Sequence, residues 1–174
     1  MGNLSIHFDG TEFRCPCCGS LGKGIETELI RKLELLFDAM NAGAIIITSG
    51  YRCPPHSVAV GGYANDAHTK GIAADIKVRK IDGSYYKPET VAREAEKIGF
   101  SGIGIMTNAT HVDIRNAKNY YNSHWFGDER TGENIATFKN MGEPIKRDDN
   151  TFPKKIRIKV YADDVLITDK EIEI

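Results

Sequence analysis

The chain has 174 residues, of which 41% are hydrophobic, so it can bury one core of ordinary size with a small appendage, and two full domains are not expected. Its 23 lysine and arginine residues nearly balance 24 aspartate and glutamate residues, so no overall field would hold it on nucleic acid or an anionic membrane. The start, MGNLSIHFDG, lacks the features of a signal peptide, and no apolar run could span a bilayer. We therefore expect a protein made in the cytoplasm without a classical export signal.

Four cysteines lie near the start of the chain, too clustered for a disulfide framework. Cys15 and Cys18 form a C-x-x-C pair, and Cys53 and His56 form a C-x-x-H pair. Three thiolates and one imidazole at these spacings predict a closed, structural zinc site. Two alternatives stay open, namely reduced thiols below the fold and one disulfide between Cys53 and the cluster. Cys17 is then a spare thiol or a substitute ligand.

Local patterns predict the first elements. Apolar residues recur at steps of three and four from Ile25 to Met40, which predicts an amphipathic helix that ends before Gly43. A short β-branched run at 44–48 predicts a buried strand leading into the segment SGYR. The stretch 53–70 is rich in Pro, Gly, Asn and Asp without periodicity, so we expect a long ordered loop there.

The remaining patterns complete an α+β fold, an antiparallel sheet flanked by helices. Further elements are expected as a strand at 72–78, a helix at 88–98, and strands at 103–106 and 110–114. After Arg115 the chain becomes polar, and its end alternates over two runs about an Ala-Asp-Asp turn, which predicts a small β-hairpin. We divide the chain into a main domain, residues 1–125, and a C-terminal extension, residues 126–174.

Three polar residues of this frame are candidate ligands of one zinc ion. They are His68 in the loop, Asp75 in the following strand and His111 in the strand 110–114. Apolar neighbours surround Asp75, so its carboxylate needs a cation or a firm hydrogen-bond partner. Two imidazoles and one carboxylate leave a fourth position open for a water that zinc can acidify, which is hydrolase chemistry.

Strand alternation places a second carboxylate near this site. In THVDI, His111 and Asp113 point to one side, and Val112 and Ile114 point to the core. We therefore expect Asp113 to face the same cleft as His111.

The motifs SGYR, GG, HTKGIAAD and THVDIR occur in one order and together resemble the M15 family of zinc D-Ala-D-Ala peptidases. This family includes D,D-carboxypeptidases and phage endolysins, and hedgehog domains share its fold. The resemblance covers roughly residues 5–125 and implies that His68, Asp75 and His111 hold the catalytic zinc. It also implies that Arg52 anchors a substrate carboxylate or carbonyl and so takes part in catalysis, with Ser49 of the same segment in the substrate site.

The sequence departs from the family pattern at two places. Asp66 stands where many relatives have Ser or Thr, and it either adds negative charge beside the metal or caps the loop. The catalytic acid that several relatives carry shortly before the last histidine is missing from residues 105–110. Asp113 is our choice for the base, and the alternative is that it orients a histidine ligand. The aromatic residues Tyr120, Tyr121 and Trp125 either stack on wall sugars or join the tail to the main domain.

The ligand pattern predicts a zinc hydrolase, and the resemblance to M15 peptidases implies that it hydrolyses peptidoglycan stem peptides at a bond involving a D-amino acid. Peptidoglycan peptides are the expected partners, with no nucleic acid and no membrane. The cell wall is the expected place of action, and the protein would reach it either as a phage-encoded lysin or by a nonclassical export route. The alternatives are a catalytically silent wall-binding or signalling module that keeps zinc, and a phage structural adapter.

Overall fold

In the computed structural model, residues 2–115, 124–145, 155–162 and 165–173 are described. The helices are α1 (Thr27–Ala39), α2 (Pro54–Ala59) and α3 (Pro88–Ile98), with 3-10 turns η1 (Gly10–Phe13) and η2 (His68–Lys70). The strands are β1 (Ala42–Ser49), β2 (Ala73–Lys80), β3 (Gly102–Ile105), β4 (Thr110–Asp113), β5 (Trp125–Asp128), β6 (Glu133–Asn134), β7 (Lys155–Ala162) and β8 (Val165–Glu173). None of the helices in the described part of the chain is long and apolar enough to cross a membrane.

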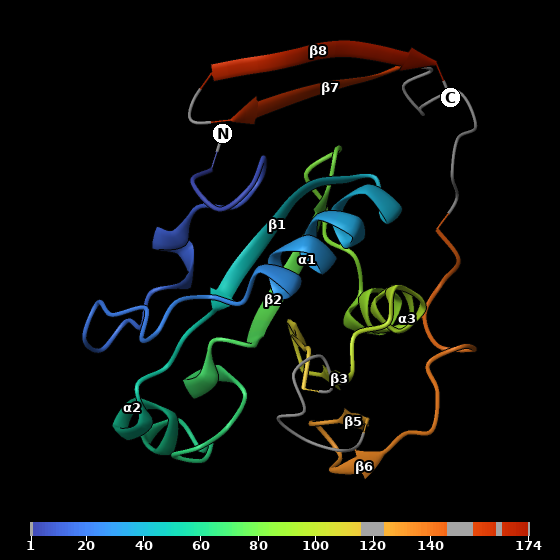
Figure 1. The fold of residues 1–174 in the computed structure, drawn as a ribbon. Coiled ribbons are helices and arrows are strands. Elements are labelled where there is room, and N and C mark those ends of the chain that lie inside the picture. The colour runs from blue at the N-terminus through green and yellow to red at the C-terminus, as the bar shows by residue number, and fades with distance from the viewer. Residues whose placement is uncertain (1, 116–123, 146–154, 163–164, 174) are drawn as a thin grey trace.

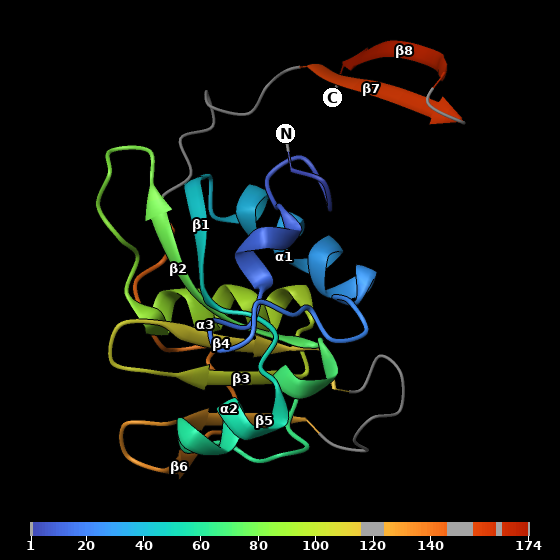
Figure 2. The same cartoon turned by 90° about the vertical axis from the view of Figure 1, so that its left-hand side faces the viewer.

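The first six strands form one sheet in the order β1-β2-β4-β3-β5-β6, and Figure 2 shows the β4, β3, β5 and β6 part of this order. The predicted α+β class is confirmed, but the sheet is mixed, because β5 pairs with β3 in parallel while the other neighbours are antiparallel. A parallel neighbour needs a crossover connection rather than a tight hairpin. Local sequence patterns do not reveal such a return.

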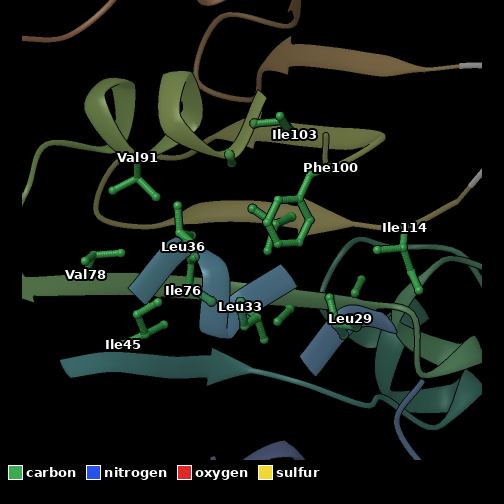
Figure 3. Packing of buried hydrophobic residues seen from close by; sticks show 14 of the residues in the cluster. Leu29, Leu33, Leu36, Ile45, Ile76, Val78, Val91, Phe100, Ile103 and Ile114 are labelled. Carbon is green, nitrogen blue, oxygen red and sulfur yellow. The ribbon is translucent and has the colours of Figure 1, made fainter. Parts of the chain in front are cut away.

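The hydrophobic core lies between this sheet and helices α1 and α3. Figure 1 shows α1 lying along β1 and β2, with α3 beside it. Leu29, Leu33 and Leu36 recur at steps of three and four on α1 and are fully buried against side chains of the sheet and α3 (Figure 3). Each such leucine contributes about 1.5–3 kcal/mol relative to an exposed one. This packing fixes the helix on one face of the sheet and leaves the other face for a site.

One predicted element differs from the structure. The segment 53–70 is not a continuous loop, because it contains the short helix α2 and the turn η2. Pro54 and Pro55 occupy the first positions of α2, where proline's fixed φ suits a helix and its missing N–H costs nothing. Six residues are too few to show a helical period in the sequence.

Residues beyond 125 contribute to the main sheet through β5 and β6. The segment after them returns to α3, where Phe138 is fully buried and its backbone N–H donates to Glu96 at 2.9 Å. The guanidinium of Arg93 donates to the Gly142 carbonyl at 3.1 Å. The domain division at residue 125 stays a prediction, and the structure shows that the sheet continues past it.

The predicted C-terminal hairpin is present as the antiparallel pair β7 and β8, a separate two-stranded sheet. Its expected turn residues, Asp163 and Asp164, lie outside the described residues, as do Tyr120 and Tyr121 of the predicted aromatic group.

Candidate metal centre

The sheet register brings the three predicted metal ligands together. Asp75 on β2 pairs directly with His111 on β4, so their side chains share one face of the sheet. His68 opens η2, which ends at Gly71 with a φ of +69°, a conformation that glycine adopts readily. A Cβ at that position would lie 2.2 Å from the Gly24 carbonyl oxygen, so the close turn also requires glycine.

The three ligand atoms are spaced as a tetrahedral metal requires. His68 Nε2 lies 3.2 Å from His111 Nδ1 and 3.3 Å from Asp75 Oδ1, and the last two atoms lie 2.9 Å apart. Metal–ligand bonds of about 2.0–2.1 Å give tetrahedral edges of about 3.3 Å. All three residues are buried, so the described donor set fits a zinc ion with one position left open.

Each ligand also has an outer hydrogen-bond partner. The Gly50 carbonyl accepts from His68 Nδ1 at 2.7 Å, which leaves Nε2 of that ring for the metal. Asp113 Oδ2 lies 3.2 Å from His111 Nε2, which leaves Nδ1 of that ring for the metal. Arg52 donates to the second oxygen of Asp75. These contacts hold all three ligands in the orientation that coordination needs.

The charges around the ligands favour a bound cation. Burial alone would lower the pKa of His111, but the carboxylates of Asp113 and Asp75 outweigh it and raise this pKa to about 10. Burial would raise the pKa of Asp75, but hydrogen bonds from His111 and His68 hold it well below its usual range. A proton and a metal therefore compete for the same negative charge, and zinc binding is expected to release protons.

The open side of the ligand group faces a cleft of about 930 Å³. Its lining combines the ligands with cationic, acidic and aromatic side chains, among them Arg52, Asp66, Arg115, Trp125 and Glu129. The Arg115 guanidinium lies 5.5 Å from the centre of the Trp125 ring, within range for a cation–π contact. The cleft can therefore hold a polar chain with its reactive bond beside the metal position.

The expectation that Asp113 faces this cleft needs correction. Asp113 shares a sheet face with His111, but it is completely buried and does not line the cleft. Arg115 covers it with its backbone N–H at 2.9 Å and its Nε at 3.0 Å. Burial would raise the pKa of Asp113, but His111 and Arg115 hold it well below its usual range. The geometry thus favours the alternative role, in which Asp113 orients the His111 ring.

We expect Asp113→Asn to weaken zinc affinity by about 10–100-fold, because an amide supports the His111 ring less strongly than a carboxylate. Activity should return at high zinc concentration. Zinc titration with a competing chromophoric chelator measures the affinity, and rates at rising zinc concentration measure the recovery. A rate that stays about 100-fold low at saturating zinc would instead support Asp113 as the base.

Arg52 and Ser49 form a pair beside the ligands. Arg52 Nε donates to Ser49 Oγ at 2.8 Å, and the other end of the guanidinium donates to Asp75. Arg52 lines the cleft, whereas Ser49 is absent from its lining. The structure therefore shows Ser49 bracing Arg52 and Arg52 bracing a metal ligand, and substrate contact by either residue stays a prediction.

Sequence reasoning missed Glu129, an acid that lines the cleft directly after β5. Its backbone N–H donates to the Ile105 carbonyl at 2.8 Å, which fixes it at the end of the parallel β3–β5 pair. The residue as a whole is exposed, while its carboxyl lies at the cleft among neighbouring side chains. Partial burial of the carboxyl raises the pKa of Glu129, with His111 opposing this rise and Asp75 adding to it. Within the described residues, no side chain or backbone group donates a hydrogen bond to this carboxylate.

The glycines of β3 make room for both acids on the site face. A Cβ on Gly104 would lie 2.4 Å from Glu129 Oε1, and one on Gly102 would lie 2.1 Å from Asp113 Oδ2. Gly104 on β3 is also the direct strand partner of His111 on β4. The Glu129 carboxylate therefore lies over β3, next to the candidate ligand His111. The alternation GIGI, with isoleucines buried and glycines opposite, is the one sequence signal that larger side chains arrive from neighbouring strands.

Asp66 has a structural position that matches its predicted capping role. Its Oδ1 accepts from the Thr69 N–H at 2.9 Å, and its Oδ2 accepts from the Ser57 hydroxyl. Burial would raise the pKa of Asp66, but these donors lower it below the ordinary value. Both oxygens are thus engaged in holding the turn that presents His68.

The second predicted metal site is brought together in part. The sulfur atoms of Cys15, Cys18 and Cys53 lie within 4.8 Å of one another, but His56 is not part of this group. His56 lies inside α2, while Cys53 precedes the helix in an extended conformation. Cys17 is exposed and also outside the group.

Comparison with known proteins places this α+β chain and its ligand group in one family. The model of the Peptidase M15 family matches residues 6–114, which is more than half of the chain and includes all three ligands. The chain therefore belongs to the Peptidase M15 family and is a metallopeptidase by class. Peptidases of this family are zinc enzymes, and the buried His68, Asp75 and His111 group is suited to that metal. No curated protein matches the chain.

Proposed function

We propose that the protein is a zinc peptidase that hydrolyses stem-peptide bonds of peptidoglycan at a D-amino acid. The observation that carries this proposal is a ligand group of two imidazoles and one carboxylate whose open side faces a cleft of about 930 Å³ with charged and aromatic side chains in its lining. A zinc ion bound there would lower the pKa of a bound water toward about 7 and polarise a carbonyl oxygen. The family match supports the metal and the reaction class, and the substrate is our inference.

Glu129 is the residue that we propose as the proton acceptor. It lines the cleft beside the strand that carries His111, and it is accessible and not already bound by other described groups. A general base must reach the attacking water and be unprotonated at working pH. Burial raises the pKa of Glu129 above that of an ordinary glutamate, which makes its carboxylate a stronger proton acceptor, and the protonated form can return the proton to the leaving amine.

The lining of the cleft supports a substrate that carries carboxylates. Arg52 and Arg115 both line the cleft, and guanidinium groups bind carboxylates through paired hydrogen bonds. Peptidoglycan stem peptides carry such carboxylates at their ends and side chains. Trp125 adds an aromatic surface on which a peptide or a sugar can stack.

The test is digestion of purified peptidoglycan followed by mass spectrometry of the soluble fragments. We expect fragments that have lost a terminal D-amino acid or carry a new amine at a cross-link, and no such fragments after treatment with a chelator. Binding to the wall without any cleavage at saturating zinc would overturn the proposal in favour of a silent wall-binding module. Cleavage of ordinary L-peptides alone would overturn the substrate assignment.

A further inference from the structure

A second cluster of metal-binding side chains lies outside the cleft. Cys15 follows η1, Cys18 closes the tight turn after it, and Cys53 lies 35 residues further along the chain, yet their sulfur atoms lie within 4.8 Å of one another. The turn is held by two backbone hydrogen bonds of 2.8 Å, from Cys15 to the Ser20 carbonyl and from Gly19 to the Cys15 carbonyl. Three cysteines from two separate segments thus converge on one point.

We propose that Cys15, Cys18 and Cys53 bind a structural zinc ion. Zinc–sulfur bonds of about 2.3 Å give sulfur–sulfur edges of about 3.8 Å in a tetrahedron, which suits the observed spacing. A disulfide would engage only two of the three sulfurs and would leave the third without a role. Because Cys18 is exposed, solvent can reach the metal and supply the fourth ligand that a tetrahedral zinc needs.

The surroundings of Cys15 support a thiolate. The backbone N–H groups of Cys53, Cys17 and Cys18 act as hydrogen-bond donors to its sulfur. The Cys53 N–H lies 3.4 Å from the Cys15 sulfur. Backbone donors that converge on one buried sulfur stabilise the charged form that a metal binds.

This site would tie the N-terminal segment to the segment that supports the catalytic ligands. Tyr51 donates its N–H to the Phe13 carbonyl at 2.8 Å, and a Cβ on Gly50 would lie only 2.5 Å from Phe13 Cα. The same short segment supplies the Gly50 carbonyl that orients His68 and the Arg52 side chain that binds Asp75. A metal at Cys53 would therefore immobilise the segment that supports the catalytic metal ligands, without taking part in the catalytic reaction. The inference stands independently of the peptide that the enzyme cleaves.

The experiment is metal analysis of the purified chain and three variants. We expect about two zinc ions per chain, and about one each for Cys18→Ser and for His111→Ala, because each change empties a different site. Cys17→Ser is the matched control and should keep both ions. Loss of the Cys site should also lower the melting temperature by on the order of 10 °C. A single zinc ion in the unaltered chain that disappears in His111→Ala would overturn the proposal.

A second measurement does not depend on the variants folding. Replacement of zinc by Co²⁺ in the unaltered chain should produce thiolate-to-cobalt charge-transfer absorption in the near ultraviolet, which His and Asp ligands cannot give. Absence of this absorption in cobalt-loaded protein would overturn the site. A mass lower by two hydrogens under non-reducing conditions would show a disulfide instead and would overturn it as well.

Discussion

Replacing His111 with alanine is expected to abolish peptidase activity and to weaken binding of the catalytic metal by more than about 100-fold. This loss of affinity is larger than the loss of about 10–100-fold expected when a ligand only loses a hydrogen-bond partner. His111 is the ligand that both Asp75 and Asp113 contact, at 2.9 and 3.2 Å. Its loss removes one of three donors and leaves two buried carboxylates without their shared partner. Metal content by elemental analysis and fragment release from peptidoglycan measure the two effects.

The fold should survive this change, because the core on the helix side of the sheet does not contain His111. Circular dichroism and a melting curve check that point. His124→Ala is the matched control, since this histidine is exposed and outside the ligand group, and it should keep both metal and activity. Full retention of the metal by His111→Ala would refute the ligand assignment.

Replacing Glu129 with glutamine should lower the rate by about 10²–10⁴-fold while the catalytic metal stays bound, because the amide keeps the shape but cannot accept the proton. Glu133→Gln is the matched control, since this exposed residue on β6 does not line the cleft. The readouts are kcat/KM on a defined stem peptide and zinc content. Near-normal turnover of Glu129→Gln would eliminate Glu129 as the base.

The pH dependence gives a further readout of the same substitution. Burial raises the pKa of Glu129, so the charged, active form is complete above this raised value and is lost as the pH falls through it. We expect an acidic limb in the kcat/KM profile above the ordinary glutamate range, and we expect this limb to disappear in Glu129→Gln. An unchanged acidic limb in the variant would assign it to another group.

The grouping of the three candidate metal ligands could be predicted from the sequence, because the resemblance to M15 peptidases singled them out and local rules determine the positions of two of them. Asp75 lies inside a short apolar strand, and alternation in THVDI aims His111 away from the core, where Val112 is buried. Strand alternation predicts on which face of the sheet a side chain lies, but it does not predict which other groups cover that side chain. Asp113 lies on the predicted face, yet Arg115 closes over it, and this contact depends on the course of the chain after β4.

Glu129 could not be predicted for a related reason. It reaches the cleft because β5 returns to the sheet and pairs with β3 in parallel, a contact across more than 20 residues with no local pattern. The four-residue strand WFGD gives little periodic signal. Helix α2 is too short to give a periodic signal in the sequence. Spacing alone groups His56 with the cysteines, but His56 lies within this helix and outside their group.

The parallel pairing of β5 also bears on where this enzyme can be shortened. The family match ends at residue 114, whereas β5 begins at Trp125. A fragment cut at the end of the match would keep His68, Asp75 and His111, the candidate zinc ligands. It would leave β3 paired on one side only, with a row of unpaired N–H and C=O groups open to other chains. Gly104 on β3 would also lose the Glu129 carboxylate, which fills the space beside it. The smallest working unit therefore extends beyond the part of the sequence that the family shares, and shorter fragments invite strand-to-strand aggregation.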